Sequence, residues 1–186
     1  MPVNYKMLLL RDLLERKEPK VKTLFKNEWV SLMSTPEENG QGYIYAHETR
    51  CNGNIVAVLL YERIGKDGWK YGLREEKTPC WGDKAQLSSL TGGVEKGSTP
   101  AAAAVKEIME EAGLVCVEND LKSLGNCRGT KSSDTLYHLF ALDVSGLKQV
   151  EPTGEDVGEV KWLSTREEIN RVVCPLFYTM LYRLNL

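Results

Sequence analysis

The segment that most restricts the possible folds is residues 55–63, IVAVLLYER. Its first six residues are all apolar, with no alternation between apolar and polar side chains. A continuous apolar run of this length is typical of a strand that is buried on both faces. Turn-forming residues flank it, with NGN at 52–54 and two glycines within 65–68. We therefore predict that this segment is a central strand of a sheet.

Shorter patterns predict further strands and several helices. We expect strands at 22–33, 43–49, 69–75, 121–127, 135–144 and 159–163, and helices at 5–17, 100–112, 164–173 and 175–184. Leu24, Trp29 and Leu32 are the expected buried positions of the first strand, and Trp162 is an expected core residue. The chain has neither an internal repeat nor a regular alternation of strands and helices. This order favours an α/β or α+β sandwich with a mixed sheet over a doubly wound fold.

The composition is that of an ordinary soluble globular domain. The 186 residues are 42% apolar and 27% charged, which allows one core and a small N-terminal appendage. A net charge of −2 argues against an extended nucleic-acid surface, although a small anionic ligand remains compatible with it. No apolar run reaches the roughly twenty residues of a membrane span, and the N-terminus lacks a signal-peptide pattern. The five cysteines include no CxxC pair, which indicates reduced thiols, so we expect a cytoplasmic protein.

Residues 91–114, TGGVEKGSTPAAAAVKEIMEEAGL, combine a glycine-rich loop with a sharply delimited helix. The glycines allow the backbone to approach other groups closely. Thr99 is a favourable N-cap, and Pro100 occupies the first helical position, where its missing N–H has no cost. Gly113 ends the helix after a run of small alanines that allows close packing on a sheet.

The predicted helix carries three carboxylates, Glu107, Glu110 and Glu111. Residues three and four positions apart lie on the same side of a helix, so these side chains repel one another. A hard divalent cation such as Mg²⁺ converts that repulsion into coordination, binds phosphate oxygens and acidifies a bound water. Acidic helix faces are more often solvated surface, however. The helix by itself therefore leaves a metal site and a plain surface as alternatives.

The spacing within 92–114 resembles the Nudix box, G-x5-E-x7-R-E-U-x-E-E-x-G-U, in which U is aliphatic. Seven of the nine specified positions match when the first glycine of the pattern is set on Gly92. The two departures are Ser98, where the family has Glu, and Lys106, where it has Arg. The resemblance implies a Nudix-type α/β/α sandwich with a mixed sheet and an N-terminal extension. It also implies a metal-dependent hydrolase that cleaves the diphosphate of a nucleoside diphosphate linked to a further group.

By this resemblance, Glu107 and Glu111 are the principal ligands of a Mg²⁺ or Mn²⁺ cofactor. Glu110 is a further ligand or orients the attacking water, and the backbone carbonyl of Thr91 matches a ligand of some family members. The same resemblance places Glu110 and Glu111 among the catalytic residues.

Many family members take one more acidic catalytic residue from a loop beyond the box. The segment GEDVGE at 154–159 offers Glu155 and Asp156, and we expect Glu155 to take that part. A plain acidic surface loop is the alternative for this segment.

The two departures concern the ion pair that supports the box in the family. A Glu and an Arg form a bidentate pair, which a Ser and a Lys cannot reproduce. Both partners have changed together, so no charge need be left unpaired, and Glu95 is an available partner for Lys106. A catalytically weak or inactive nucleotide- or RNA-binding module is therefore the alternative to an enzyme.

The wider layout is similar to the branch of the family that cleaves ADP-ribose and ADP-sugars. That branch has an N-terminal extension, here 1–40, which commonly builds homodimers, ahead of a Nudix domain, here 41–186. It often has a proline beyond the box, which is missing in CRGT at 127–130. The layout implies a small nucleotide substrate of the ADP-ribose type. Nucleoside triphosphates, caps and dinucleoside polyphosphates are the alternatives.

Substrate contacts are expected from an aromatic side chain against the base and a basic side chain against phosphate. The aromatic candidates are Trp29, Tyr43, Tyr45 and Trp81, and the basic candidates are Arg128 and Lys131. Of these we expect Trp29 and Arg128 to bind the substrate. Core packing is the alternative for each aromatic residue, and an exposed loop position is the alternative for each basic one.

Overall fold

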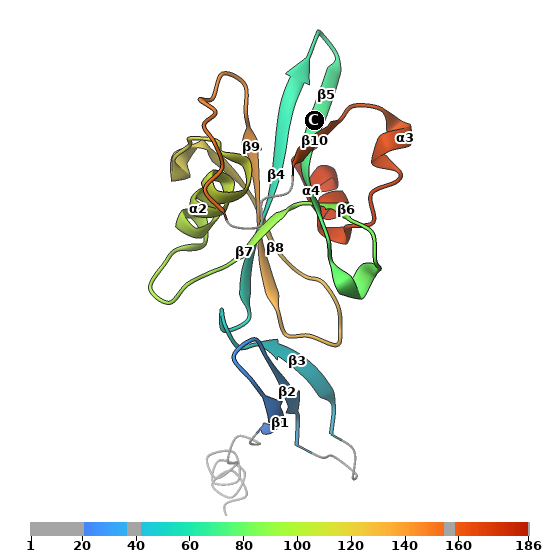
Figure 1. The fold of residues 1–186 in the computed structure, drawn as a ribbon. Helices are drawn as coiled ribbons and strands as arrows, with labels where there is room; N and C mark the ends of the chain where they lie inside the picture. Colours follow the sequence, from blue (N-terminus) through green and yellow to red (C-terminus); the bar gives the residue numbers. More distant parts are fainter. Residues whose placement is uncertain (1–20, 37–41, 155–158, 186) are drawn as a thin grey trace, which may run out of the picture.

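The computed structural model describes residues 21–36, 42–154 and 159–185. The helix expected at 5–17 lies outside these residues, as do Glu155 and Asp156. The described strands form two sheets (Figure 1). The smaller sheet is antiparallel and consists of β1 (Lys22–Lys26), β2 (Val30–Ser34) and β3 (Ile44–Glu48), in that order.

The larger sheet has seven strands, and β4 lies at its centre. Its order is β10–β5–β4–β9–β8, with β6 beside β5 and β7 beside β4. The strands are β4 (Asn54–Ile64), β5 (Gly68–Glu76), β6 (Gln86–Ser88), β7 (Leu90–Gly93), β8 (Leu121–Arg128), β9 (Leu136–Asp143) and β10 (Val160–Leu163). β4 runs parallel to β9 and antiparallel to β5 and β7, which confirms the predicted mixed sheet. Residues 56–60 are fully buried, as predicted for a central strand.

Helices cover both faces of the larger sheet, with α2 on one side and α4 on the other (Figure 1). The helices are α2 (Pro100–Ala112), α3 (Arg166–Ile169) and α4 (Pro175–Leu184), with short 3₁₀ turns η1 (Pro79–Trp81) and η2 (Glu118–Asp120). Side chains alternate along a strand, so Val56 of β4 packs with Ile108 of α2, whereas Leu59 packs with Phe177 of α4. The predicted α/β/α sandwich is confirmed. Within the described residues, no helix has the length and apolar character to span a membrane.

Both ends of α2 form as the sequence predicts. The Thr99 hydroxyl accepts a hydrogen bond from the backbone N–H of Ala102 at 3.0 Å. At the other end, Gly113 has φ +63° and its N–H donates to the carbonyl of Met109 at 3.1 Å. A Cβ at Gly113 would lie 2.1 Å from the Val150 carbonyl oxygen, so both the conformation and the space require glycine.

The single strand predicted for 22–33 is wrong, because the chain turns between β1 and β2 at Asn27. The Asn27 side-chain oxygen accepts hydrogen bonds from the backbone N–H groups of Trp29, at 2.9 Å, and Val30, at 2.7 Å. Asn side chains that bond the backbone two or three residues on favour a turn over a continuing strand. The turn brings β1 and β2 together as a hairpin.

The burial expected for the first strand is also wrong. Leu24, Trp29 and Leu32 are 51%, 57% and 40% exposed. Successive residues of a strand face opposite sides of the sheet. Ser31 lies on the side that faces the rest of the chain and is buried, while Leu32 lies on the open side. One face of the small sheet is therefore apolar and uncovered by the described residues.

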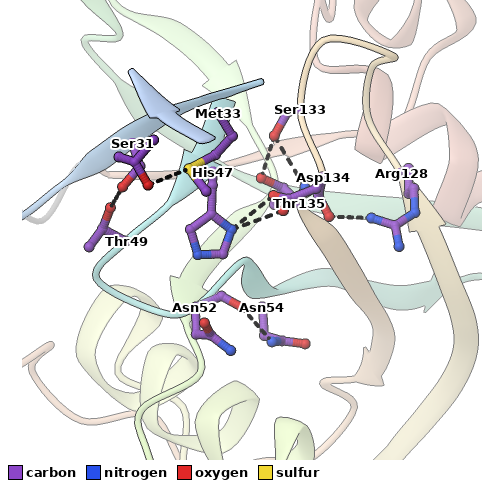
Figure 2. A network of polar contacts seen from close by, with 11 residues as sticks. Ser31, Met33, His47, Thr49, Asn52, Asn54, Arg128, Ser133, Asp134 and Thr135 are labelled. Atoms are coloured by element: carbon purple, nitrogen blue, oxygen red, sulfur yellow. Dashed lines mark hydrogen bonds and ion pairs between the residues drawn. The ribbon is translucent and has the colours of Figure 1, made fainter. Parts of the chain in front are cut away.

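The loop between β8 and β9 attaches the small sheet to the large one (Figure 2). The Ala46 N–H donates to the Ser132 carbonyl at 2.8 Å, and the Asp134 N–H donates to the Ala46 carbonyl at 3.2 Å. The Nδ1 atom of His47 lies 3.0 Å from the Asp134 carboxylate. β3 is thus held to the large sheet through both backbone and side chains.

The packing of α2 on the sheet is testable at Ile108, which is fully buried between α2 and β4. Ile108→Ala leaves a cavity in this core, so the free energy of unfolding should fall by about 2–5 kcal/mol. Ile64→Ala, at the 42% exposed end of β4, is the matched control and should have a much smaller effect. Urea unfolding followed by circular dichroism measures both. Equal losses in the two variants would contradict this packing.

Candidate active site

Glu107 lies on α2, directly against Gly92 of strand β7. A Cβ added to Gly92 would lie 1.9 Å from Glu107 Cδ, so a side chain at position 92 would displace the carboxylate. Partial burial raises the pKa of Glu107, and the nearby Glu110 raises it further. The first glycine of the box therefore creates the space in which this carboxylate lies.

Glu111, one helical turn further on, is more deeply buried, with 12% of its side chain exposed. Arg74 of β5 donates a hydrogen bond to its Oε1 atom and also lies 3.2 Å from Glu76. The backbone N–H of Thr91 in β7 is close enough to act on Glu111, where it lowers the pKa of the carboxyl group. Among the described residues, neither Glu111 Oε2 nor Arg74 Nε has a hydrogen-bond partner, although both atoms are buried.

The pKa of Glu111 is raised to about 8. Burial is the main cause, the Arg74 guanidinium opposes it, and Glu107 and Glu76 raise the pKa further. A carboxyl group with this pKa keeps its proton at neutral pH until an added cation stabilises the charged form. An additional positive charge near Glu111 would therefore stabilise the ionised form of its carboxyl group.

Lys106 has the partner that we named for it. Its Nζ atom lies 2.6 Å from Glu95 Oε1 and 3.9 Å from Glu110. The Glu95 contact raises the pKa of Lys106 and lowers that of Glu95. Ser98, the other departure from the box, directs its hydroxyl to the Thr99 carbonyl at 3.3 Å. Lys106 and Glu95 thus form an ion pair, and Ser98 takes no part in it.

The carboxylates fit a hard divalent cation, although they do not form a complete ligand cluster. Within the described part of the chain, no three His, Cys, Asp or Glu side chains converge in a way that would hold a metal ion. Glu107 and Glu111 nevertheless both lie against β7, and the Oε2 atom of Glu111 is buried without a partner among the described residues. Carboxylate oxygens are the ligands that such cations prefer.

A cavity of ≈730 Å³ opens beside Glu111. Its walls come from β4, β5, β10, the end of α2 and residues 144–154. Trp162 lines this cavity and is 37% exposed, so the prediction that it is a core residue is wrong. It lies on β10, an edge strand of the large sheet.

Sequence reasoning missed two arginines. Arg74 reaches Glu111 from β5, a strand 37 residues away in the chain. Arg50 lies with its guanidinium carbon 5.8 Å from the centroid of the Trp29 ring, and its charge acts to lower the pKa of Glu107. No local pattern indicated either residue, because both act through pairings between distant segments. Arg50 thus lies over Trp29 and acts electrostatically on Glu107.

Arg128 lies elsewhere, at the end of β8, and its guanidinium donates to a backbone carbonyl of the β8–β9 loop (Figure 2). It lines a second cavity of ≈760 Å³ together with Tyr43, Tyr45 and Lys131. The Tyr43 hydroxyl donates to the Lys131 carbonyl across this cavity. Four of the expected substrate residues therefore line one cavity, and this cavity is not the one beside Glu111. Trp81 lies on η1, is 42% exposed and lines neither cavity.

Comparison with known proteins identifies the family. The profile of the NUDIX domain matches residues 52–173, which include α2 and both buried carboxylates. The chain belongs to the Nudix family. The Nudix fold described here is similar to a solved structure described as an ADP compounds hydrolase, with a TM-score of 0.61 and 17% sequence identity. The match covers 90% of this chain and 92% of the other, and at this identity it shows the fold alone. A search of curated proteins found no match.

The raised pKa of Glu111 makes the stability of the metal-free Nudix protein depend on pH. Its pKa rises from 4.5 to about 8 on folding, so between these values the folded state holds a proton that the unfolded chain releases. The stability contributed by this group is complete below the lower value and is lost as the pH rises through the window, by at most about 1.4 kcal/mol per pH unit. Glu111→Gln removes this loss.

The free energy of unfolding of Glu111→Gln, relative to that of the wild type, should therefore increase between about pH 5.5 and pH 8. Urea unfolding in the presence of a chelator measures this difference at each pH. A difference that stays constant across the window would show that Glu111 is not protonated in the folded protein.

Proposed function

We propose that this Nudix protein is a divalent-metal-dependent pyrophosphohydrolase acting on a nucleoside diphosphate linked to a group X. The products are a nucleoside monophosphate and phosphorylated X. The observation that carries the proposal is the pair Glu107 and Glu111, buried against β7 beside a cavity, with Glu111 Oε2 lacking a partner among the described residues. The fold neighbour described as an ADP compounds hydrolase supports the same class of substrate.

Glu107 and Glu111 would hold the ion, with Glu110 and the Thr91 carbonyl as further ligands, and we propose Mg²⁺ or Mn²⁺. When bound, such a cation neutralises phosphate oxygens and lowers the pKa of a coordinated water. Gly92 leaves room for the Glu107 carboxylate, and the hydrogen bond from Arg74 orients that of Glu111. Both carboxylates are therefore positioned before substrate arrives, which is a requirement for efficient catalysis.

Arg74 is the proposed phosphate-binding cation. Its side chain is 15% exposed, and its Nε atom has no hydrogen-bond partner among the described residues. A guanidinium matches phosphate oxygens in a bidentate geometry, and its charge stabilises the negative charge that develops on the leaving phosphate. In the free protein, the Arg74 guanidinium lies against the Glu111 carboxyl group and opposes the rise of its pKa. A bound cation would add to this effect, and Arg74 would then be available to a phosphate group.

Trp29 and Arg50 form the proposed binding site for the nucleoside. The Trp29 ring is 57% exposed, which leaves it free to stack on a base. Arg50, whose guanidinium carbon lies 5.8 Å from the ring centroid, also acts to lower the pKa of Glu107. Arg128 remains a proposed substrate residue on the strength of its cavity with Tyr43 and Tyr45. Glu155 also remains a proposal for the additional acidic group, and it lies outside the described residues.

A binding module without turnover is the second candidate function, and Ser98 and Lys106 are the observation that favours it. The Lys106–Glu95 ion pair weighs against it, because it replaces the charge compensation that the usual box provides. Hydrolysis of nucleoside triphosphates or caps is a third candidate that shares the same carboxylates. The compounds that the protein hydrolyses, or its failure to hydrolyse any, distinguish these three candidate functions.

A substrate panel tests the proposed reaction. Incubation with Mg²⁺ or Mn²⁺ and ADP-ribose, ADP-sugars, NADH, FAD, dinucleoside polyphosphates or nucleoside triphosphates should release a nucleoside monophosphate from the diphosphate-linked compounds. Glu111→Gln should lower kcat by roughly a hundredfold or more, because it removes one of the two buried carboxylates. Anion-exchange chromatography of the products measures turnover.

The matched control is Glu75→Gln, an exposed carboxylate beside Arg74 in β5, which should retain wild-type turnover. Absence of turnover above the Glu111→Gln level with every compound would overturn the enzymatic function in favour of the binding module. Full turnover in Glu111→Gln would overturn the assignment of the metal site.

We also propose that the open face of the small sheet builds a homodimer. Phe25, Val30, Leu32 and Ile44 are 55%, 37%, 40% and 53% exposed, and the strand register places them on one face. A contiguous apolar face of this kind marks an interaction surface. A second copy of the chain offers an identical face, so two such faces are complementary in chemistry.

Sedimentation velocity tests the dimer. The wild type should sediment with about twice the 20.9 kDa mass of one chain, and Leu32→Asp should sediment as a monomer because it places a charge in the interface. Val173→Asp changes another exposed apolar residue, one away from the small sheet, and should stay dimeric. A monomeric wild type would overturn the proposed dimer.

A further inference from the structure

Three buried side-chain atoms have no hydrogen-bond partner among the described residues, namely Arg74 Nε, Ser88 Oγ and Glu111 Oε2. Nearly all buried polar groups in folded proteins have such a partner, so each exception needs a reason. These three atoms belong to one cluster. Arg74 donates a hydrogen bond to Glu111 and is paired directly with Ser88 across strands β5 and β6. The proposed function uses Arg74 and Glu111 and leaves the Ser88 hydroxyl unexplained.

The side chain of Ser88 points to the same side of the large sheet as the proposed site. Leu73 and Leu87, the residues just before Arg74 and Ser88, pack in the core that α4 covers. Successive residues of a strand face opposite sides, so Arg74 and Ser88 both face α2 and Glu111. Residues directly opposite in an antiparallel pair have Cβ atoms about 4.5–5.5 Å apart. The Ser88 hydroxyl is therefore a direct neighbour of the Arg74 side chain.

The terminal nitrogens of Arg74 already have partners on two sides. One donates to Glu111, and the other lies 3.2 Å from Glu76 Oε2. Glu76 is itself fixed, because its Oε1 atom accepts a hydrogen bond from the Thr78 hydroxyl at 2.7 Å. A guanidinium is planar and presents its N–H groups in a fixed geometry. An acceptor for the remaining Nε–H group would therefore determine the plane of the guanidinium.

Ser88 can supply this acceptor when Arg74 leaves Glu111. A cation bound by Glu111 would repel the positive charge of Arg74, so the guanidinium would move away from that carboxylate. The Ser88 hydroxyl has two acceptor lone pairs. Ser88 is only 4% exposed, so solvent water does not compete for its hydroxyl. A small movement of Arg74 would thus satisfy two of the three unpartnered atoms at once.

We propose that Ser88 is a positioning residue for Arg74, whose Nε–H group it accepts in the loaded site. Together with Glu76, it then holds the guanidinium in the plane that presents its terminal nitrogens to a phosphate group. This inference rests on the proposed function, to which it adds a residue of β6. Ser88 itself does not touch the substrate.

Ser88→Ala tests the inference, because it removes the hydroxyl without changing any charge. Its kcat/KM for the best substrate of the panel should fall by about tenfold or more, as expected for a hydrogen bond to a charged group. Urea unfolding of the metal-free protein should show no loss of stability, since the hydroxyl has no partner there among the described residues. Ser88→Thr keeps a hydroxyl and should retain most of the activity. A loss of stability in Ser88→Ala would assign Ser88 a structural role and overturn the inference.

Two further variants show whether Ser88 acts through Arg74. Ser89→Ala is the matched control, because Ser89 is 1% exposed and its hydroxyl lies 3.9 Å from the Cys174 thiol, in the core on the α4 side. It should keep the wild-type kcat/KM. Arg74→Lys has a methylene in place of Nε, so adding Ser88→Ala to it should cause no further loss. A further tenfold loss in that background, or full activity of Ser88→Ala alone, would overturn the inference while leaving the proposed function intact.

Binding keeps the inference testable when none of the compounds is hydrolysed, a result that would count against the proposed function. Isothermal titration with ADP in Mg²⁺ should then show about tenfold weaker binding to Ser88→Ala than to the wild type. Ser89→Ala should bind ADP as the wild type does. Equal affinity of the wild type and Ser88→Ala for ADP would overturn the inference.

Discussion

The close packing of α2 on β4 and β7 determines the geometry and the electrostatics of the whole site. Ile108 lies between Glu107 and Glu111 in the helix, so burying Ile108 against β4 brings both carboxylates into the interface with β7. The contact with Gly92 is so close that a side chain there would displace the Glu107 carboxylate. Burial raises the pKa of both carboxyl groups, and water no longer solvates their charge. The fold therefore places these groups where they gain most from a bound cation.

Two ion pairs lie next to the proposed metal site, one exposed to solvent and one buried. Lys106 and Glu95 are 50% and 71% exposed, and pairs so accessible to water contribute little to stability. Arg74 and Glu111 are 15% and 12% exposed, so water screens their interaction much less, and Arg74 also lies 3.2 Å from Glu76. Lys106, one of the two departures from the box, thus belongs to the weaker pair. The stronger pair comes from β5, which lies outside the box.

Local signals account for what the sequence predicted well. The apolar run of β4 indicated a central strand, and the capping groups of α2 placed both ends of the helix and hence the carboxylates on it. The alternation in β2 tells which residues share a face, but it does not tell whether a second layer covers that face, so Leu32 was expected to be buried. The same limit applied to Trp162. Arg74 meets Glu111 only through the packing of distant segments, which no local pattern records.

The proposed nucleoside site and the buried carboxylates belong to different parts of the fold, so the distance between them depends on the joint between the two sheets. Trp29 lies in the first turn of the small sheet, whereas Glu107 and Glu111 lie on α2, which packs on the large sheet. Backbone hydrogen bonds from Ala46 to the β8–β9 loop hold the sheets together, and the His47–Asp134 contact reinforces them (Figure 2). Backbone bonds persist when side chains change. The joint uses the edge of β3, and His47 lies on the face of the small sheet opposite Leu32, so a dimer formed through the open face would leave the joint intact.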